Sequence, residues 1–461
     1  MEKRKRKCIE TRLPEAIIHI IQSFLSDEEA ARTTVISKSW YKAWLTRPAL
    51  VLVLRNLRRK SSAAEFSKFA AKTMRRYQDS NLKIESLSLK MRGCRRSSEP
   101  LARKLIADAM KLGATDLKLE FFPTGFALPA EVLGSETLLR LSVSGCKIDG
   151  NVNCSMLKSL SLDSVLLKRE DMLRILTSCC NSIEELSLSN SPIVNYIIEL
   201  RWQNLHEFHK LKRLYLERVP VGNSLTYLES QCPCLEDLSL VHCYNTGIHV
   251  KSSSLQRISI VQCAASGLQF EVPNLAVFSY SGRDIPAISI KARDEWESHI
   301  SIERHHNETS SWYRDLHKRL TQLSLSRINL TIKIVGSRPC TNRCLNDIRA
   351  VANPVAVENM RVETEYDVGR IMRCLFRMCR PKLVTLCWLD CDCECWMSNN
   401  HSLRTLCEKL MGPTKRRKMF ELKEGKMEVY EEDVAEWRPL LLQDATRAPP
   451  MGRKVRFHLK W

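Results

Sequence analysis

The sequence predicts an α/β protein in which a small N-terminal helical unit precedes a curved solenoid of stacked parallel strands. Three observations lead to this prediction. A short leucine-rich pattern recurs along much of the 461 residues, helix-like segments lie between its copies, and residues 13–44 carry apolar side chains at helical spacing. Because a chain of this length exceeds one compact core, an array of repeats is a natural arrangement for it.

The recurring pattern is leucine, two residues, leucine, one residue, leucine, with conservative exchanges. It runs from IESLSL at residues 84–89 to LAVFSY at residues 275–280. The central positions of nine successive copies are Leu87, Leu117, Leu141, Leu160, Leu186, Leu214, Leu238, Ile258 and Phe278. Neighbouring centres are 19 to 30 residues apart, close to the period of about 20–29 residues that is typical of leucine-rich repeats.

Each copy predicts a short strand, because its last two apolar residues alternate with polar ones. Residues 169–176 carry the apolar spacing of a helix between two such strands. One repeat cannot bury its apolar side alone, so the repeats stack, with their parallel strands on the concave face. Cysteines follow four of the strands at similar offsets, where a small buried residue suits the turn into the core: Cys94, Cys146, Cys243 and Cys263.

After Tyr280 the spacing loosens. We expect a polar insertion at 283–311, another copy of the pattern at 320–325, a helix at 367–378 and a strand at 383–388. The predicted domains are a basic tail (1–12), the helical unit (13–50), a helical linker (51–80), repeats that become irregular after residue 283 (81–411) and a charged C-terminal tail (412–461).

Residues 13–44 predict three short helices. Pro14 suits the first position of a helix, which then carries apolar residues at helical spacing, namely Ile17, Ile18, Ile21, Phe24 and Leu25. Ser26 with Glu29 forms a capping box for a second helix, and Ser37 caps a third. Helices this short have more apolar surface than they can bury among themselves, which indicates a docking face.

The order of residues in LPEAIIHIIQSFLSDEEAARTTVISKSWYKAW, residues 13–44, closely resembles the F-box of plant F-box/leucine-rich-repeat proteins. In that family the box binds the Skp-type adaptor of an SCF ubiquitin ligase, and through it a cullin, while the repeats bind the target protein. The departures are Ala16, where the family often has an acidic residue, and Ser39, where it commonly has a basic one. The resemblance implies that the adaptor would be bound by Leu13, Pro14, Ile17, Ile18, Ile21 and Leu25.

The net charge of +20 comes partly from basic clusters at residues 3–7, 55–60 and 415–418. Clusters at chain ends and linkers indicate solvated tails or import signals, so we expect a location in the nucleus and the cytoplasm. Nucleic acid is an unlikely partner, since no recognised nucleic-acid module accompanies the charge. No signal peptide or membrane span is expected, and the 19 cysteines are then thiols in a reducing compartment.

Nothing in the sequence points to catalysis. We find no phosphate-binding glycine loop and no nucleophile elbow. Cys391, Cys393 and Cys395 alternate, a spacing that fits structural zinc poorly, and His305 and His306 lack a cysteine or carboxylate framework. We therefore expect no cofactor and no metal, and a non-catalytic receptor that holds an unknown target protein near a ubiquitin-charged enzyme. The alternative is a repeat-based binding scaffold outside the ubiquitin system, associated with nucleic acid through its charge.

The outward residue between the two strand leucines is serine in eight of ten copies: Ser88, Ser142, Ser161, Ser187, Ser239, Ser259, Ser279 and Ser324. Serine offers little contact area, whereas binding hot spots are usually tyrosine, tryptophan or arginine. The exceptional Tyr215 and its outward neighbours therefore predict a target-binding patch made of Arg213, Tyr215, Glu217, Asp237 and Arg257. The plainer interpretation is that these are ordinary solvated charges.

Overall fold

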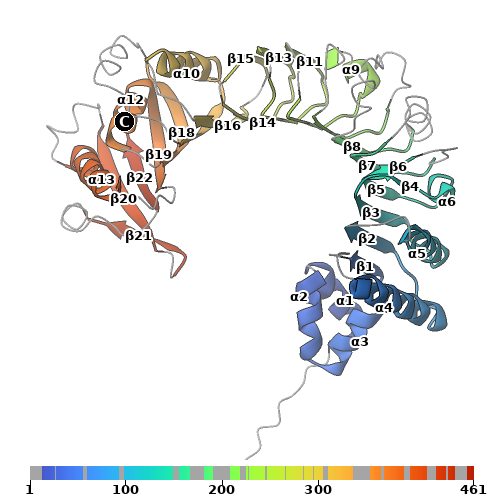
Figure 1. Ribbon diagram of the computed structural model, residues 1–461. Coiled ribbons are helices and arrows are strands. Elements are labelled where there is room, and N and C mark those ends of the chain that lie inside the picture. Colours follow the sequence, from blue (N-terminus) through green and yellow to red (C-terminus); the bar gives the residue numbers. More distant parts are fainter. Residues whose placement is uncertain are drawn as a thin grey trace, which may run out of the picture. The chain divides into compact units, whose positions relative to one another are not determined.

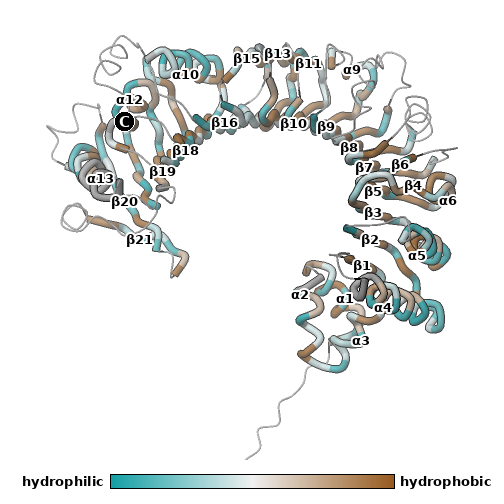
Figure 2. Tube along the Cα trace, viewed as in Figure 1, coloured by the Kyte–Doolittle hydropathy of each residue, from teal (hydrophilic) through white to brown (hydrophobic). Residues whose placement is uncertain are grey.

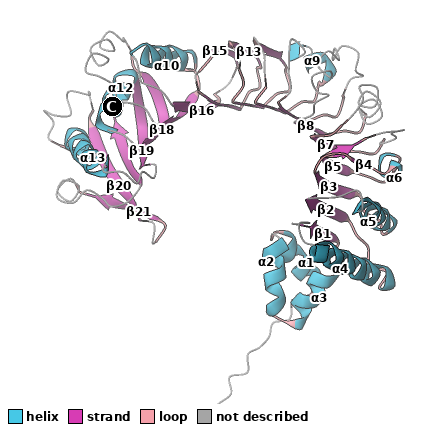
Figure 3. Ribbon diagram, viewed as in Figure 1, coloured by secondary structure: helices cyan, strands magenta, loops and turns pink. Residues whose placement is uncertain are grey.

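The computed structural model describes residues 13–25, 27–54, 60–92, 98–148, 155–166, 181–189, 208–218, 225–226, 228–243, 247–264, 266–283, 285–293, 295–304, 310–335, 353–364, 368–388, 395–412, 422–431, 434–441 and 454–461. The chain forms two compact units, Met1–Leu200 with Asn204–Leu211, and Arg201–Gln203 with Lys212–Trp461. Each unit is a sheet of mostly parallel strands with helices on one side (Figures 1 and 3). No helix among the described residues is long and apolar enough to cross a bilayer.

The first unit begins with helices α1 (Glu15–Ser23), α2 (Asp27–Arg32) and α3 (Lys38–Thr46), with a short 3-10 helix, η1 (Thr33–Val35), before α3. The expected cap of the third helix is confirmed, since the backbone N–H of Trp40 donates to the Ser37 hydroxyl at 3.5 Å. Ser26, the expected cap of the second helix, lies outside the described residues.

The sheet of the first unit contains six parallel strands in chain order: β1 (Ala49–Leu54), β2 (Ser86–Arg92), β3 (Asp116–Phe122), β5 (Arg140–Ser144), β7 (Ser159–Asp163) and β8 (Glu185–Ser189). Beside them lie α4 (Lys60–Asp79), α5 (Glu99–Lys111), α6 (Ala130–Leu133) and a small pair, β4 (Phe126–Ala127) with β6 (Cys146–Lys147). The five copies of the leucine pattern in this unit are thus confirmed as strands. The helical linker expected at 51–80 is only partly right, because strand β1 occupies residues 49–54.

The second unit continues with eight parallel strands: β9 (Arg213–Glu217), β10 (Asp237–Val241), β12 (Arg257–Val261), β14 (Val277–Gly282), β16 (Glu297–Arg304), β17 (Arg327–Ile334), β18 (Val355–Thr364) and β19 (Cys379–Trp388). Its helices are α9 (Leu228–Gln231), α10 (Ser310–Gln322), α12 (Val368–Met378) and α13 (Cys395–Met411). A second parallel sheet joins β11 (Ile248–Lys251), β13 (Gly267–Glu271) and β15 (Ala287–Lys291). The helix expected at 367–378 and the strand expected at 383–388 are confirmed.

The turn after several strands repeats one conformation. Ser164, Arg218, His242 and Gln262 have φ angles near +50°, and Gly145 has a φ of +70°. The backbone N–H of each of these residues donates to a carbonyl at or near the end of the next strand, as the N–H of Arg218 does to the Val241 carbonyl at 2.8 Å. Cys146 and Cys243 are buried close to these turns, as expected, and Cys263 is half-buried, while Cys94 lies outside the described residues.

Two expectations after Tyr280 are wrong. Residues 320–325 are not a strand, because Leu316, Leu320 and Leu323 are buried on one side of α10 and the turn that follows it, leaving Leu325 83% exposed. The expected insertion at 283–311 contains β15 and β16. Strand β16 carries no leucine, but its buried residues alternate with more exposed ones as a strand requires.

The expected charged tail at 412–461 is also corrected. It contains the strands β20 (Glu424–Glu431), β21 (Glu436–Leu440) and β22 (Lys454–Lys460), which are antiparallel and joined to the main sheet by pairing of β22 with β19. In β22 the charged residues alternate with Val455, Phe457 and Leu459, all buried. Apolar and polar positions are likewise interspersed along the neighbouring strands of the sheet (Figure 2). A composition that looks charged thus conceals a strand with one apolar side.

The first prediction tests this extension of the sheet. Phe457→Ala removes a fully buried ring, so we expect it to lower the free energy of unfolding by about 3–5 kcal/mol. Lys460→Ala, on the exposed side of the same strand, should cost less than about 1 kcal/mol. Urea denaturation followed by circular dichroism measures both, and equal midpoints for the two variants would contradict the placement of β22.

Candidate docking surfaces

The N-terminal helices expose an unusual amount of apolar surface. Phe24 and Val35 are 84% and 87% exposed. We call the N-terminal apolar face the set formed by Leu13, Ile17, Ile20, Phe24, Val35, Ile36 and Tyr41. The members on or next to α1 are spaced three or four residues apart, so they form one stripe along the helix.

The opposite side of α1 forms the interior of the helical unit. Ile18 is fully buried there, and the buried Gln22 amide donates to the Thr33 hydroxyl at 3.0 Å and to the Trp40 carbonyl at 3.3 Å. At the start of the helix, the Thr46 hydroxyl donates to Glu15 Oε1 at 2.9 Å. This bond, with help from Lys42 at 3.5 Å, lowers the pKa of Glu15. These contacts fix α1 against α3, so the exposed stripe is held in place.

The expected adaptor-binding residues divide between the two sides of α1. Leu13, Pro14 and Ile17 are exposed, and Ile21 and Leu25 are half-buried. The expectation that Ile18 contacts an adaptor is corrected, because its side chain has no exposed surface and cannot contact a partner while the helices are folded. Five further apolar side chains of these helices are exposed, although the sequence did not single them out for docking: Ile20, Phe24, Val35, Ile36 and Tyr41.

The five expected target-binding residues do lie together in the second unit. Strand pairing aligns Arg213, Asp237 and Arg257 in one row, and places Tyr215 in the next row beside Ser239. Arg257 donates to Asp237 at 2.8 Å, and this hydrogen bond raises the pKa of Arg257.

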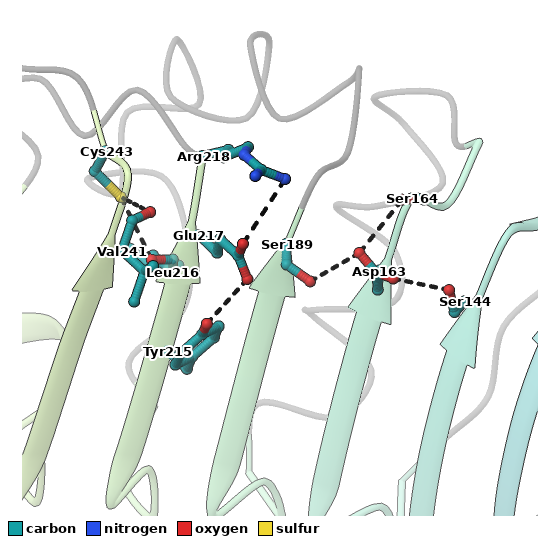
Figure 4. Close-up of polar contacts among 10 residues, drawn as sticks. All are labelled: Ser144, Asp163, Ser164, Ser189, Tyr215, Leu216, Glu217, Arg218, Val241 and Cys243. Atoms are coloured by element: carbon teal, nitrogen blue, oxygen red, sulfur yellow. Dashed lines mark hydrogen bonds and ion pairs between the residues drawn. The ribbon is translucent and has the colours of Figure 1, made fainter. Parts of the chain in front are cut away.

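The Tyr215 hydroxyl is already engaged by its own strand. It donates to Glu217 Oε2 at 2.9 Å, and Glu217 lies 3.8 Å from Arg218 (Figure 4). Burial and the neighbouring Glu217 carboxylate raise the pKa of Tyr215 to about 12, so the phenol stays protonated at neutral pH. The patch thus already pairs Arg257 with Asp237 and Tyr215 with Glu217, which reduces what it can offer a partner.

The serine column is present in both units. Strand register aligns Ser88, Lys118, Ser142, Ser161 and Ser187 in the first. It aligns Tyr215, Ser239, Ser259 and Ser279 in the second. Ser324 does not belong to the column, because it follows α10. In the first unit the Asp163 carboxylate accepts hydrogen bonds from Ser144, Ser164 and Ser189 (Figure 4). These bonds join the ends of three neighbouring strands, β5, β7 and β8.

Within the part of the chain that the structure describes, no three His, Cys, Asp or Glu side chains are arranged to hold a metal ion. Cys391, Cys393, His305 and His306 lie outside that part, and the side chain of Cys395 is not described. Cys387 and Cys407, near them in sequence, are buried thiols, and burial raises the pKa of each.

Comparison with known proteins finds similarity to a family model and to several plant proteins. A family model described as Leucine Rich Repeat matches residues 156–181. A putative F-box/LRR-repeat protein of Arabidopsis thaliana is 29% identical over 214 residues, covering 40% of this chain and 41% of that protein. A second F-box/LRR-repeat protein of that plant is 30% identical over 210 residues, covering 44% and 40%.

A putative F-box/FBD/LRR-repeat protein of Arabidopsis thaliana is 25% identical over a longer segment of 292 residues, covering 57% of this chain and 66% of that protein. The matches to the first two relatives span about two fifths of their length.

The second prediction separates the two sides of α1. Ile18→Asp buries an unpaired carboxylate at a cost of several kcal/mol, so amide protons of α1 and α3 should exchange much faster with solvent. Phe24→Asp changes an exposed side chain and should leave their exchange within about twofold of the parent. Hydrogen exchange with mass spectrometry measures both, and equal protection in the two variants would refute the assignment of Ile18 to the interior.

Proposed function

We propose that this chain, a relative of the plant F-box/leucine-rich-repeat proteins, is the substrate-recognition subunit of an SCF-type ubiquitin ligase. In this proposal helices α1–α3 are the F-box and bind a Skp-type adaptor, and through it a cullin. The observation that carries the proposal is the N-terminal apolar face, which lies on the segment whose sequence resembles the box.

The physical argument concerns exposed apolar area. Soluble domains rarely leave several large apolar side chains together in water, and such a patch usually marks a docking site. Two of its members, Phe24 and Val35, are more than four fifths exposed, so a partner that covers them would gain about 25 cal/mol for each Å² removed from water. A helical cap that only closed a repeat array would need an apolar side toward the array, and a second one toward solvent would have no purpose.

The role proposed for the chain is to create proximity. The repeat units would hold a target protein while the box joins them to the ligase, so that a target lysine meets the ubiquitin-charged enzyme at high effective concentration. This role requires no catalytic group in the chain itself.

The alternative, a nucleic-acid-associated scaffold, relies on the net charge of +20. Many cations on the strand faces already have acidic partners, including Arg140 with Asp116, Arg257 with Asp237 and Lys333 with Glu303. Binding to a phosphate backbone depends on cations that can replace counterions. These paired side chains are poorly suited to that task, so the ligase role is favoured.

The third prediction tests adaptor binding. Ile20→Asp with Phe24→Asp places two carboxylates in the proposed contact, so capture of a Skp-type adaptor should fall by a few hundredfold or more. Leu325→Asp is the control, because Leu325 is about as exposed as Phe24 but lies in the second unit. Quantitative co-purification gives the readout, and undiminished capture by the folded double variant would remove the ligase role.

The fourth prediction concerns location. We propose that the basic cluster from Lys3 to Lys7, which lies outside the described residues, directs part of the protein to the nucleus. Replacing all five residues by alanine should move a fluorescently tagged chain toward the cytoplasm. An unchanged ratio of nuclear to cytoplasmic fluorescence would reject this signal.

A further inference from the structure

The last strands of the second unit form a continuous outward face. Strand pairing aligns Arg361, Thr385, Arg456 and Glu428 in a single row that crosses β18, β19, β22 and β20. Tyr430 of β20 pairs in turn with Trp437 of β21. We call the C-terminal face the set formed by Arg361, Glu428, Tyr430, Trp437, Lys454 and Arg456.

Rings and cations are packed together on this face. The Tyr430 and Trp437 ring centroids are 5.3 Å apart. Lys454 Nζ lies 4.9 Å from the Tyr430 centroid, and Arg456 Cζ lies 4.3 Å from the Trp437 centroid. All four side chains are half-buried, so little further side-chain entropy is lost when a partner binds.

The composition of the face is that of a binding hot spot. Tyrosine, tryptophan and arginine are the residues most enriched at such positions. The serine column on β10, β12 and β14 offers none of them, and the Tyr215 hydroxyl is bound to Glu217. The C-terminal face is therefore a better candidate for target contact than the patch around Tyr215.

The charges of the face determine what it can bind. Arg456 and His458 both donate to Glu428, and Arg361 donates to Glu363 at 2.6 Å. Burial alone would raise the pKa of Glu428, but these two hydrogen bonds outweigh it and lower the pKa, so the carboxylate stays ionised and holds Arg456. Among the residues that the structure describes, Lys454 has a ring contact but no ion pair. The face thus keeps an uncompensated positive charge beside two aromatic rings.

We infer that the C-terminal face is the target-binding surface, and that it takes an acidic segment of the target protein with an apolar or aromatic side chain nearby. The inference rests on the proposed role as a target receptor. A carboxylate of the segment pairs with Lys454, and its apolar neighbour packs against Trp437. Glu428 and Glu363 lie on or beside the face. A nucleic-acid backbone carries a charge at every phosphate and would bring some of them against these carboxylates, whereas a peptide can place one carboxylate at Lys454 and apolar residues elsewhere, so an acidic peptide fits better.

The fifth prediction tests this with the complete chain and a phage library of random dodecapeptides. Peptides selected on the parent chain should be enriched in Asp and Glu, and their binding should weaken as salt is raised. Lys454→Glu and Trp437→Ala should each lower retention of the selected pool at least about tenfold.

Control variants test whether the loss of binding is specific to the C-terminal face. Lys318→Glu makes the same charge change on an exposed position of α10, and Tyr215→Ala removes an aromatic residue from the other patch; neither should change retention. Lys454→Gln and Trp437→Phe, with thermal unfolding of every variant, separate loss of binding from loss of fold.

The inference is overturned by a pool without acidic enrichment, by equal retention on Lys454→Glu and the parent, by loss on Tyr215→Ala, or by displacement of the peptides by a single-stranded DNA oligonucleotide at equal concentration. Adaptor capture is measured on the same samples. If the parent chain fails to capture an adaptor but selects acidic peptides, the ligase role falls and the binding surface remains.

Discussion

The structure depends on one constraint, which is that each parallel strand of the main sheet must bury one side and leave the other in water. In each strand formed by the leucine pattern, two or three apolar side chains from alternate positions face the interior, as Leu238 and Leu240 do in β10, and the neighbouring repeat covers them. Because parallel pairing keeps the strands in register, the outward residues then fall into straight rows across the sheet. The rows make the surfaces described above, so a change of register by one residue would exchange core and surface along a whole strand.

The same constraint explains how much of the fold could be predicted from the sequence. The copies of the leucine pattern up to Tyr280 are strands as predicted, because leucine at fixed spacing indicates both the strand and its buried side. Strands β16, β17 and β18 bury mainly isoleucine, valine and methionine, and the alternation of these residues with charged ones resembles a polar loop. The copy of the pattern at 320–325 was expected to be a strand and is not. Its leucines also have the spacing of a helix, and the preceding Leu316 extends that spacing.

The two proposed docking surfaces show why site residues are harder to predict than helices and strands. Helix α1 has two apolar stripes, and the stripe that is buried includes the polar Gln22, which satisfies part of its amide inside the unit. Hydrophobicity alone therefore could not distinguish the interior from the exposed face, and Ile18 was assigned to the wrong side. The C-terminal face was still harder to predict. Tyr430, Trp437 and Arg456 come together only through antiparallel pairing of three strands, in a segment whose composition suggested a tail.

The two proposed surfaces rely on different physics, which suits different tasks. The N-terminal apolar face would act mainly through burial of apolar area, a non-directional force that suits a single fixed partner. The C-terminal face combines rings, guanidinium groups and carboxylates in fixed positions, so a wrong partner would leave a charge unpaired or a ring uncovered. Because such mismatches cost more than the correct contacts gain, a polar face discriminates between targets better than an apolar one of equal size. A receptor that must always find the same adaptor and select a particular target would be expected to divide its surfaces in this way.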